Sequence, residues 1–193
     1  MARPQSIDDE DLLSRLGRVF RDVGYEGASV AALSEATGLQ KASLYHRYPG
    51  GKQEMAEHVL SAAMDWFGEH VIAHLNADGP AERRLVEVTK SLSTFYDGGR
   101  QACLLNVLAS PPVESGPFSP AIKIAIEQLV DGFSKLARDA GLGARAARER
   151  GTRALMLVQG GLVLSRGLGS VEPFRQALKA LPETLLPEKP SKE

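Results

Sequence analysis

Apolar residues at helical spacing are the feature that most limits what this chain can fold into. Between breaks rich in Gly and Pro, apolar residues recur every three or four positions, and no stretch sustains an alternation with a period of two. Because strands in a half-buried sheet need that alternation, the chain is expected to be all-α. Its 193 residues, 43% of them hydrophobic, are enough to bury a core without metals or disulfides.

The breaks define the expected helices. Ser6 and Asp9 have the spacing of a capping box at the first helix, which Gly24 is expected to end, and Ser29 is the expected N-cap of the second helix. Pro80 suits the first turn of a later helix, and Val23 and Ile126 are expected to face inward. The expected helices cover about 7–23, 30–36, 41–48, 52–75, 80–96, 101–109, 119–140, 144–168 and 171–181, with a loop at 110–117.

Composition indicates the compartment. Cys103 is the only cysteine, so no intramolecular disulfide is possible and a reducing compartment is expected. The N-terminus carries no apolar signal segment, and the longest apolar stretch, Ala154–Ser165, is shorter than the roughly 20 residues that span a bilayer. We therefore expect a cytoplasmic protein with no membrane partner.

One segment has a charge pattern unlike the rest of the chain. The net charge is −1, yet residues 36–53 contain no Asp or Glu and include Lys41, Arg47 and Lys52. This segment also holds two short expected helices around a turn at Thr37–Leu39, where Gly38 can adopt a positive φ. Such a pattern is typical of a helix-turn-helix whose second helix enters the major groove of DNA.

Specific residues extend this interpretation. The run from Phe20 through Gly24, Tyr25, Gly27 and Ser29, then Thr37-Gly38-Leu39, Ala42-Ser43-Leu44-Tyr45-His46-Arg47-Tyr48 and Lys52, resembles the DNA-binding domain of the TetR family of bacterial repressors. The match covers about residues 12–60. The Pro49-Gly50-Gly51-Lys52 form has one residue more than the common pattern and, with the later Ala102-Cys103-Leu104-Leu105, is similar to the LmrA/YxaF-like branch.

The resemblance implies roles for individual side chains. Lys41, Ala42 and Ser43 would face bases, although the Ala42 methyl can either touch thymine or only permit close approach. Tyr45 and His46 would reach phosphates or base edges, and Gln40 could do either. Ser29 and Lys52 would bind phosphates, and the side chains of Lys41 and Lys52 are expected to face solvent. The partner implied is a palindromic double-stranded operator, bound by a homodimer that a small molecule releases.

The C-terminal half is expected to hold the dimer interface and the effector site. Residues 144–168 form a helix that is apolar nearly all round in its second half, and Gly160-Gly161 would allow close approach of another helix. The expected interface residues are Leu155, Val158, Leu162, Val163, Phe174 and Leu178. An apolar or aromatic effector is expected among Trp66, Phe67, His70, Phe95, Tyr96, Cys103, Asn106, Phe118, Phe133 and Gln159.

The expected organisation is a helix-turn-helix domain over 1–52, a larger helical ligand-binding and dimerisation domain over 53–186, and a flexible tail over 187–193. Two other functions fit parts of the sequence. One is a helical interaction module without DNA binding, and the other is a small enzyme using Cys103. His70 and His74 lie one turn apart, but no acidic cluster accompanies them, so we expect no metal, no cofactor and no catalytic residue.

Overall fold

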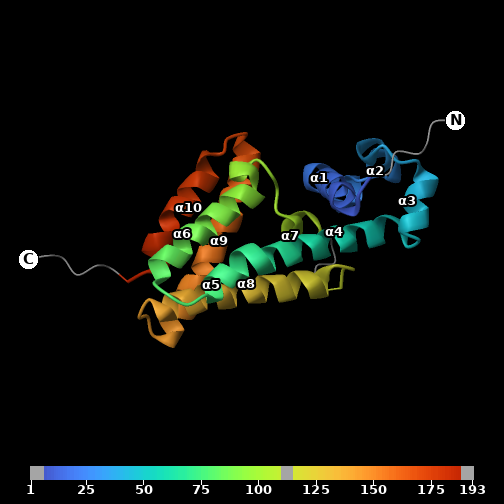
Figure 1. Ribbon diagram of the computed structural model, residues 1–193. Helices are drawn as coiled ribbons and strands as arrows, with labels where there is room; N and C mark the ends of the chain where they lie inside the picture. The colour runs from blue at the N-terminus through green and yellow to red at the C-terminus, as the bar shows by residue number, and fades with distance from the viewer. Residues whose placement is uncertain (1–6, 110–114, 188–193) are drawn as a thin grey trace, which may run out of the picture. The chain divides into compact units, whose positions relative to one another are not determined.

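The computed structural model describes residues 7–109 and 115–187, and every regular element in these two ranges is helical, which confirms the all-α class (Figure 1). Ser6 of the expected capping box, residues 110–114 of the expected loop and residues 188–193 of the tail lie outside this description. The elements are α1 (Asp9–Gly27), α2 (Val30–Thr37), α3 (Lys41–Arg47), α4 (Gly51–Phe67), the π-helix η1 (Gly68–Ile72), α5 (Ala73–Asn76), α6 (Ala81–Phe95), the 3₁₀ turn η2 (Asp97–Gly99), α7 (Leu104–Val107), α8 (Ser119–Asp139), α9 (Ala144–Leu168) and α10 (Glu172–Leu185).

The chain packs as two compact units. The N-terminal unit contains Met1–Asp65 and Cys103–Ile122, and the C-terminal unit contains Trp66–Ala102 and Lys123–Glu193. These units follow packing, so they differ from the functional boundary expected at residue 52, which stays a prediction. Among the described residues, no helix combines the length and apolar character needed to cross a membrane.

The first helix begins and ends differently from the sequence prediction. Asp8 is its N-cap, and its carboxylate accepts a hydrogen bond from the Asp11 N–H at 2.8 Å. Gly24, with φ 72° and ψ 174°, does not end α1 but forms a kink, after which the helix continues to Gly27. The prediction that Val23 faces inward is wrong, because this side chain lies just before the kink and is 52% exposed.

Helices α9 and α10 form an antiparallel pair in the C-terminal unit (Figure 1). A Cβ at Gly161 would lie 2.9 Å from the Ala177 Cβ and 3.1 Å from the Phe174 Cα, so a glycine is needed where the two helices meet. The buried Ser165 hydroxyl accepts the Phe174 N–H at 3.1 Å, and Arg150 donates to the Leu186 carbonyl at 3.0 Å. These bonds satisfy backbone groups that helix ends leave without partners.

A buried arginine on α6 ties two other elements of this unit to that helix. Arg84 on α6 is 6% exposed, and it donates to the carbonyls of His74 and Leu75 and to the Asp139 carboxylate at 2.8 Å. The hydrogen bonds from Lys135 and Arg84 lower the pKa of Asp139 below its ordinary value. The end of α5 and the end of α8 are therefore fixed to α6 by one side chain.

Several expected boundaries shift. The helix expected at 101–109 is only the short α7, because Cys103 has extended backbone angles. Pro80 is the N-cap of α6 and not part of its first turn, and α10 runs past Leu181 to Leu185 with Pro182 inside it. Ile126, expected to face inward, is 42% exposed, because the buried positions of α8 fall on Ile122, Ala125 and Leu129.

Candidate nucleic-acid interface

The turn between α2 and α3 is held by residues whose chemistry suits it. Ser29 caps α2, with its hydroxyl accepting the Ala32 N–H at 3.1 Å, as expected from sequence. At the other end Gly38 takes a left-handed conformation with φ 72°. The buried Thr37 hydroxyl donates to the Leu33 carbonyl at 2.8 Å and accepts the Leu39 N–H at 3.4 Å. The angle at which α3 leaves α2 is thereby fixed.

One face of α3 is exposed to solvent, and the other packs against the N-terminal unit. Leu44 is completely buried and attaches α3 to the unit. The outward positions, by contrast, present varied donors and acceptors together with one methyl group. The exposed side chains are Lys41, Ala42, Ser43, Tyr45, His46 and Arg47. Gln40 is the N-cap residue of α3, but its exposed side chain does not cap the helix and remains directed to solvent.

The last residue of α3 has an intramolecular role that sequence reasoning missed. Arg47 donates to the Asp9 carboxylate at 3.1 Å and to the Ile7 carbonyl at 3.2 Å, which links the end of α3 to the start of α1. The only sequence signal for this contact is the opposite charge of Arg47 and Asp9, and the two residues are 38 positions apart. In this state, a phosphate near Arg47 would compete with Asp9.

Lys52 does not lie as expected. The sequence predicts that the Lys52 side chain faces solvent, where it could bind a DNA phosphate. The prediction that it faces solvent is wrong. The half-buried Lys52 ammonium donates to the Tyr25 carbonyl at 2.9 Å and lies 4.2 Å from the centre of the Tyr25 ring. One of its three N–H donors is thus used inside the unit, and two remain for another acceptor.

Two tyrosines near this surface, Tyr25 and Tyr48, stay neutral at ordinary pH. Burial raises the pKa of Tyr25, with further contributions from the charges of Glu26 and Glu57, and burial likewise raises the pKa of Tyr48. Neither phenol therefore adds negative charge where DNA would approach. Gly51 has φ +69°, and a Cβ there would lie 3.3 Å from the Tyr45 ring, so the glycine at the start of α4 keeps room for that side chain.

The expected effector residues are distributed over both compact units. Trp66, Phe67, His70, Phe95 and Tyr96 form one aromatic cluster in the C-terminal unit, with Trp66 and His70 stacked at 4.4 Å and Trp66 and Phe95 at 4.8 Å. Phe133 and Gln159 belong to the same unit, Phe133 buried and Gln159 half-buried. The N-terminal unit holds Asn106, which is exposed, and Cys103 and Phe118, which are buried.

The expected dimer residues are mostly core residues of one chain. Leu155, Val158, Leu162, Phe174 and Leu178 are each at most 8% exposed without any partner, whereas Val163 is 52% exposed. A second chain would meet Val163 and the exposed residues that share its side of α9. Among the described residues, no group of three His, Cys, Asp or Glu side chains could hold a metal ion.

Helix α3 is exposed and polar, is anchored to the core by Leu44, and is oriented by the turn that follows α2. This is the arrangement of a helix-turn-helix DNA-binding protein. Residues 12–59 match the family described as "Bacterial regulatory proteins, tetR family". This segment is therefore a DNA-binding domain of that family, which confirms the resemblance seen in the sequence, and it supports a DNA-binding transcriptional regulator and not an enzyme.

Two relatives match most of the chain. The HTH-type transcriptional regulator LmrA of Bacillus subtilis is 23% identical over 179 residues, covering 91% of this chain and 95% of LmrA. The uncharacterized regulator YxaF of the same organism is 24% identical over 169 residues, covering 81% of this chain and 83% of YxaF. Both agree with the branch that the sequence resembles.

Solved structures share the fold. A TetR transcriptional regulator from Legionella pneumophila has a TM-score of 0.80 at 19% identity, covering 95% of this chain and all of that one. The regulator CifR, solved as a cysteine mutant complexed with 26 bp double-strand operator DNA, has a TM-score of 0.72 at 24% identity, covering 95% of this chain and 98% of that one.

Proposed function

We propose that this protein is a cytoplasmic, dimeric repressor that binds a palindromic operator and is released by a small apolar or aromatic effector. The observation that carries the proposal is the outward face of α3, where Lys41, Ala42 and Ser43 are exposed while Leu44 is buried. The N-terminal residues of a recognition helix are those that reach base edges in the major groove. CifR, which has the same fold, has been solved on operator DNA, and this supports the assignment.

Dimerisation is supported by the outer side of α9. Met156, Gly160, Val163 and Gly167 follow one another at intervals of four, three and four, so they lie on one side of the helix. Met156 is 67% exposed, and a Cβ at Gly160 or Gly167 would meet nothing within 4 Å. Glycine inside a helix costs roughly 1 kcal/mol relative to alanine. Packing within one chain explains Gly161 but not Gly160 or Gly167, whereas close approach of a second α9 would explain both.

In this proposal the effector binds at the aromatic cluster around Trp66 and Phe95. Trp66, Phe95 and His70 are at least partly exposed, while Phe67 and Tyr96 close the cluster from inside. An aromatic ligand can stack on such rings in an offset or edge-on arrangement. Release of DNA requires the ligand to bind the conformation of the dimer that cannot bind DNA more tightly than the conformation that can. A ligand with equal affinity for the two conformations would not change their populations.

A gel-shift assay with the DNA upstream of the protein's own gene tests the proposal. Wild-type protein should retard this fragment and not a scrambled one, and a variant with Lys41→Ala and Ser43→Ala should lose that preference. The exposed Arg83 of α6 gives a matched control, since Arg83→Ala should bind as wild type does. A thermal-shift screen of aromatic compounds should then find binders that dissociate the complex. Equal binding of both fragments by wild type would contradict the proposal.

A further inference from the structure

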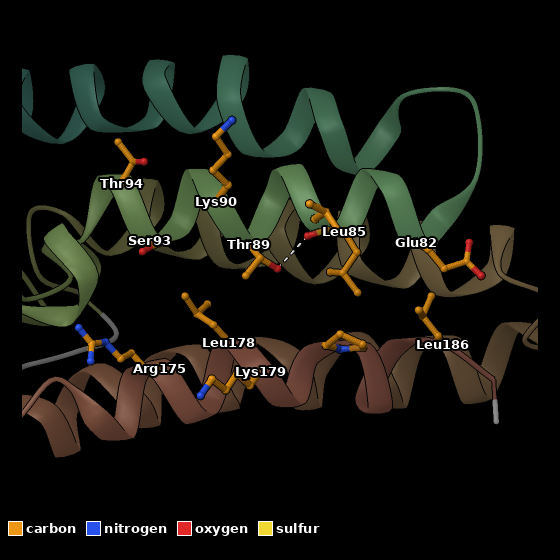
Figure 2. A pocket seen from close by; sticks show the side chains of 12 residues that line it. Glu82, Leu85, Thr89, Lys90, Ser93, Thr94, Arg175, Leu178, Lys179 and Leu186 are labelled. Atoms are coloured by element: carbon orange, nitrogen blue, oxygen red, sulfur yellow. Dashed lines mark hydrogen bonds between the residues drawn. The ribbon is translucent and has the colours of Figure 1, made fainter. Parts of the chain in front are cut away.

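An apolar groove between α6 and α10 is not explained by DNA binding or by the aromatic cluster. Its volume is about 810 Å³, within the usual range for small-molecule sites. Figure 2 shows α6 on one side and α10 on the other, with side chains of both helices directed into the space between them. All of its lining residues belong to the C-terminal unit, and none is among the ten residues expected to hold the effector.

The floor and one rim of the groove are hydrocarbon. Leu85 and Leu178 form the floor and are 2% and 6% exposed, so they are held in place by the core behind them. Val86 is 62% exposed on the rim, and Leu186 is half-buried at one end. A ligand with an alkyl part would cover apolar surface that the described chain leaves in water.

The groove carries a net positive charge, which is concentrated at the end where Arg175 lies. Arg175 and Lys179 on α10 line it, and neither forms an ion pair with any carboxylate of the described residues. Lys90 points away from α10 in Figure 2 and lies 3.8 Å from Glu87. Glu82 is the single acidic lining residue, and Figure 2 places it at the end opposite Arg175. An anionic group is therefore favoured at the Arg175 end.

The same end offers a further hydrogen-bonding group. Ser93 lies on the part of α6 that is nearest to Arg175 in Figure 2, whereas Thr94 points away from α10 there, as Lys90 does. Two cations beside a hydroxyl group suit a carboxylate, which accepts charge-assisted hydrogen bonds. The length available to the rest of the ligand follows from the length of α10 along the groove. Arg175 and Leu186 are eleven positions apart, which at the α-helical rise spans about 16 Å, the length of an extended chain of about a dozen carbons.

We propose that this groove binds a free straight-chain alkyl carboxylate of about a dozen carbons. Its carboxylate lies on Arg175 and Lys179, and its chain runs over Leu178 and Leu85 toward Leu186. The site is separate from the aromatic cluster and from α3, so the proposal goes beyond the regulatory function proposed above and does not depend on operator binding. It adds a second class of small molecule that the C-terminal unit can hold.

Calorimetric titration of the full chain with dodecanoate, below its micelle concentration and without DNA, tests this site. Wild type should bind one dodecanoate per chain, should bind dodecanol at least tenfold more weakly, and should show no binding of butanoate. The double variant Arg175→Gln/Lys179→Gln should lose at least tenfold in affinity for dodecanoate. Arg83→Gln/Arg138→Gln is the matched control, because it removes two exposed arginines outside the groove and should bind as wild type does.

A second variant separates the alkyl contact from the charge contact. Val86→Glu places a carboxylate on the exposed rim, where folding is not disturbed, and should weaken dodecanoate at least tenfold. The proposal is overturned if dodecanoate binds the double variant and Val86→Glu as tightly as wild type, or if dodecanol binds as well as dodecanoate. It is also overturned if light scattering shows that the groove variants change the oligomeric state while wild type does not bind dodecanoate, because a second chain would then occupy the groove.

Discussion

Lys52 donates a hydrogen bond to the carbonyl oxygen of Tyr25 at 2.9 Å and lies over the ring of the same residue at 4.2 Å. This contact joins the first turn of α4 to the kinked end of α1, and so it sets part of the frame that carries α2 and α3. The lysine thus has a structural role in the DNA-free protein, in addition to the phosphate contact that the family resemblance implies.

Removing this ammonium should lower stability. We expect Lys52→Met, which keeps the aliphatic stem, to reduce the free energy of unfolding by about 1–2 kcal/mol, because it loses a charged hydrogen bond and a cation–π contact. Lys41→Met is the control, since Lys41 is exposed and should leave the unfolding free energy within about 0.5 kcal/mol of wild type. Urea denaturation measures both, and equal stability of the two variants would show that the Tyr25 contact contributes nothing.

The two lysines should also differ on DNA. Lys41→Ala should weaken operator binding more than binding to scrambled DNA, by about 1–3 kcal/mol of discrimination, because a base contact carries sequence information. Lys52→Ala should weaken both DNAs alike and reduce the salt slope by about one counterion per half-site. A salt titration with both duplexes measures these effects. The opposite pattern, with specificity lost only in Lys52→Ala, would mean that α3 docks differently.

Adjacent glycines on α9 should respond in opposite ways to substitution. Gly160→Glu adds a side chain that points to open space in the single chain, so it should fold and yield monomers by light scattering. Gly161→Val places atoms against Phe174 and Ala177, so it should destabilise the α9–α10 pair and lower the melting temperature. A folded Gly160→Glu dimer would rule out this side of α9 as the interface.

Acid should weaken the cluster around Arg84. The hydrogen bonds from Lys135 and Arg84 lower the pKa of Asp139 in the folded state, so its stabilisation is present above the ordinary carboxyl pKa and is lost as pH falls through the lowered folded value. The stability difference between wild type and Asp139→Asn should therefore be constant near pH 7 and shrink below about pH 4. Thermal unfolding from pH 7 to pH 3 measures it, and a difference independent of pH would contradict the assignment.

The buried arginine itself should matter more. Arg84→Met leaves the carbonyls of His74 and Leu75 without this donor and Asp139 without one of its two cations. We expect a loss of about 3 kcal/mol in the free energy of unfolding, measured by urea denaturation. Lys135→Met, which removes only the more exposed partner of Asp139, is the control and should cost about 1 kcal/mol or less. Equal losses would indicate that the backbone contacts of Arg84 are unimportant.

Local chemistry was predictable from sequence, whereas contacts distant in the chain were not. Ser29 as N-cap and Gly38 in a left-handed turn depend on neighbouring residues, and both were predicted correctly. The contact between Lys52 and Tyr25 joins positions 27 residues apart, and no periodicity reveals it.

The apolar face of α9 shows the same limit. A helix that is apolar nearly all round gives no sign of which side packs within the chain, so Leu155, Val158 and Leu162 were expected at the interface although they are buried in one chain. In the proposed dimer, the environment of the exposed Val163 depends on a second chain whose position the sequence does not give.

The π-helix at Gly68–Ile72 has a consequence for changes in chain length. Phe67, Val71 and Leu75 are buried at intervals of four, and the π turn between them accommodates one residue more than an α turn. If one residue of Gly68–His70 were deleted, these three would be spaced by three and four, which one face of an uninterrupted α-helix also satisfies. Variants shorter by one residue here would therefore keep the same buried face, whereas deletion of His70 itself would remove the ring that stacks on Trp66.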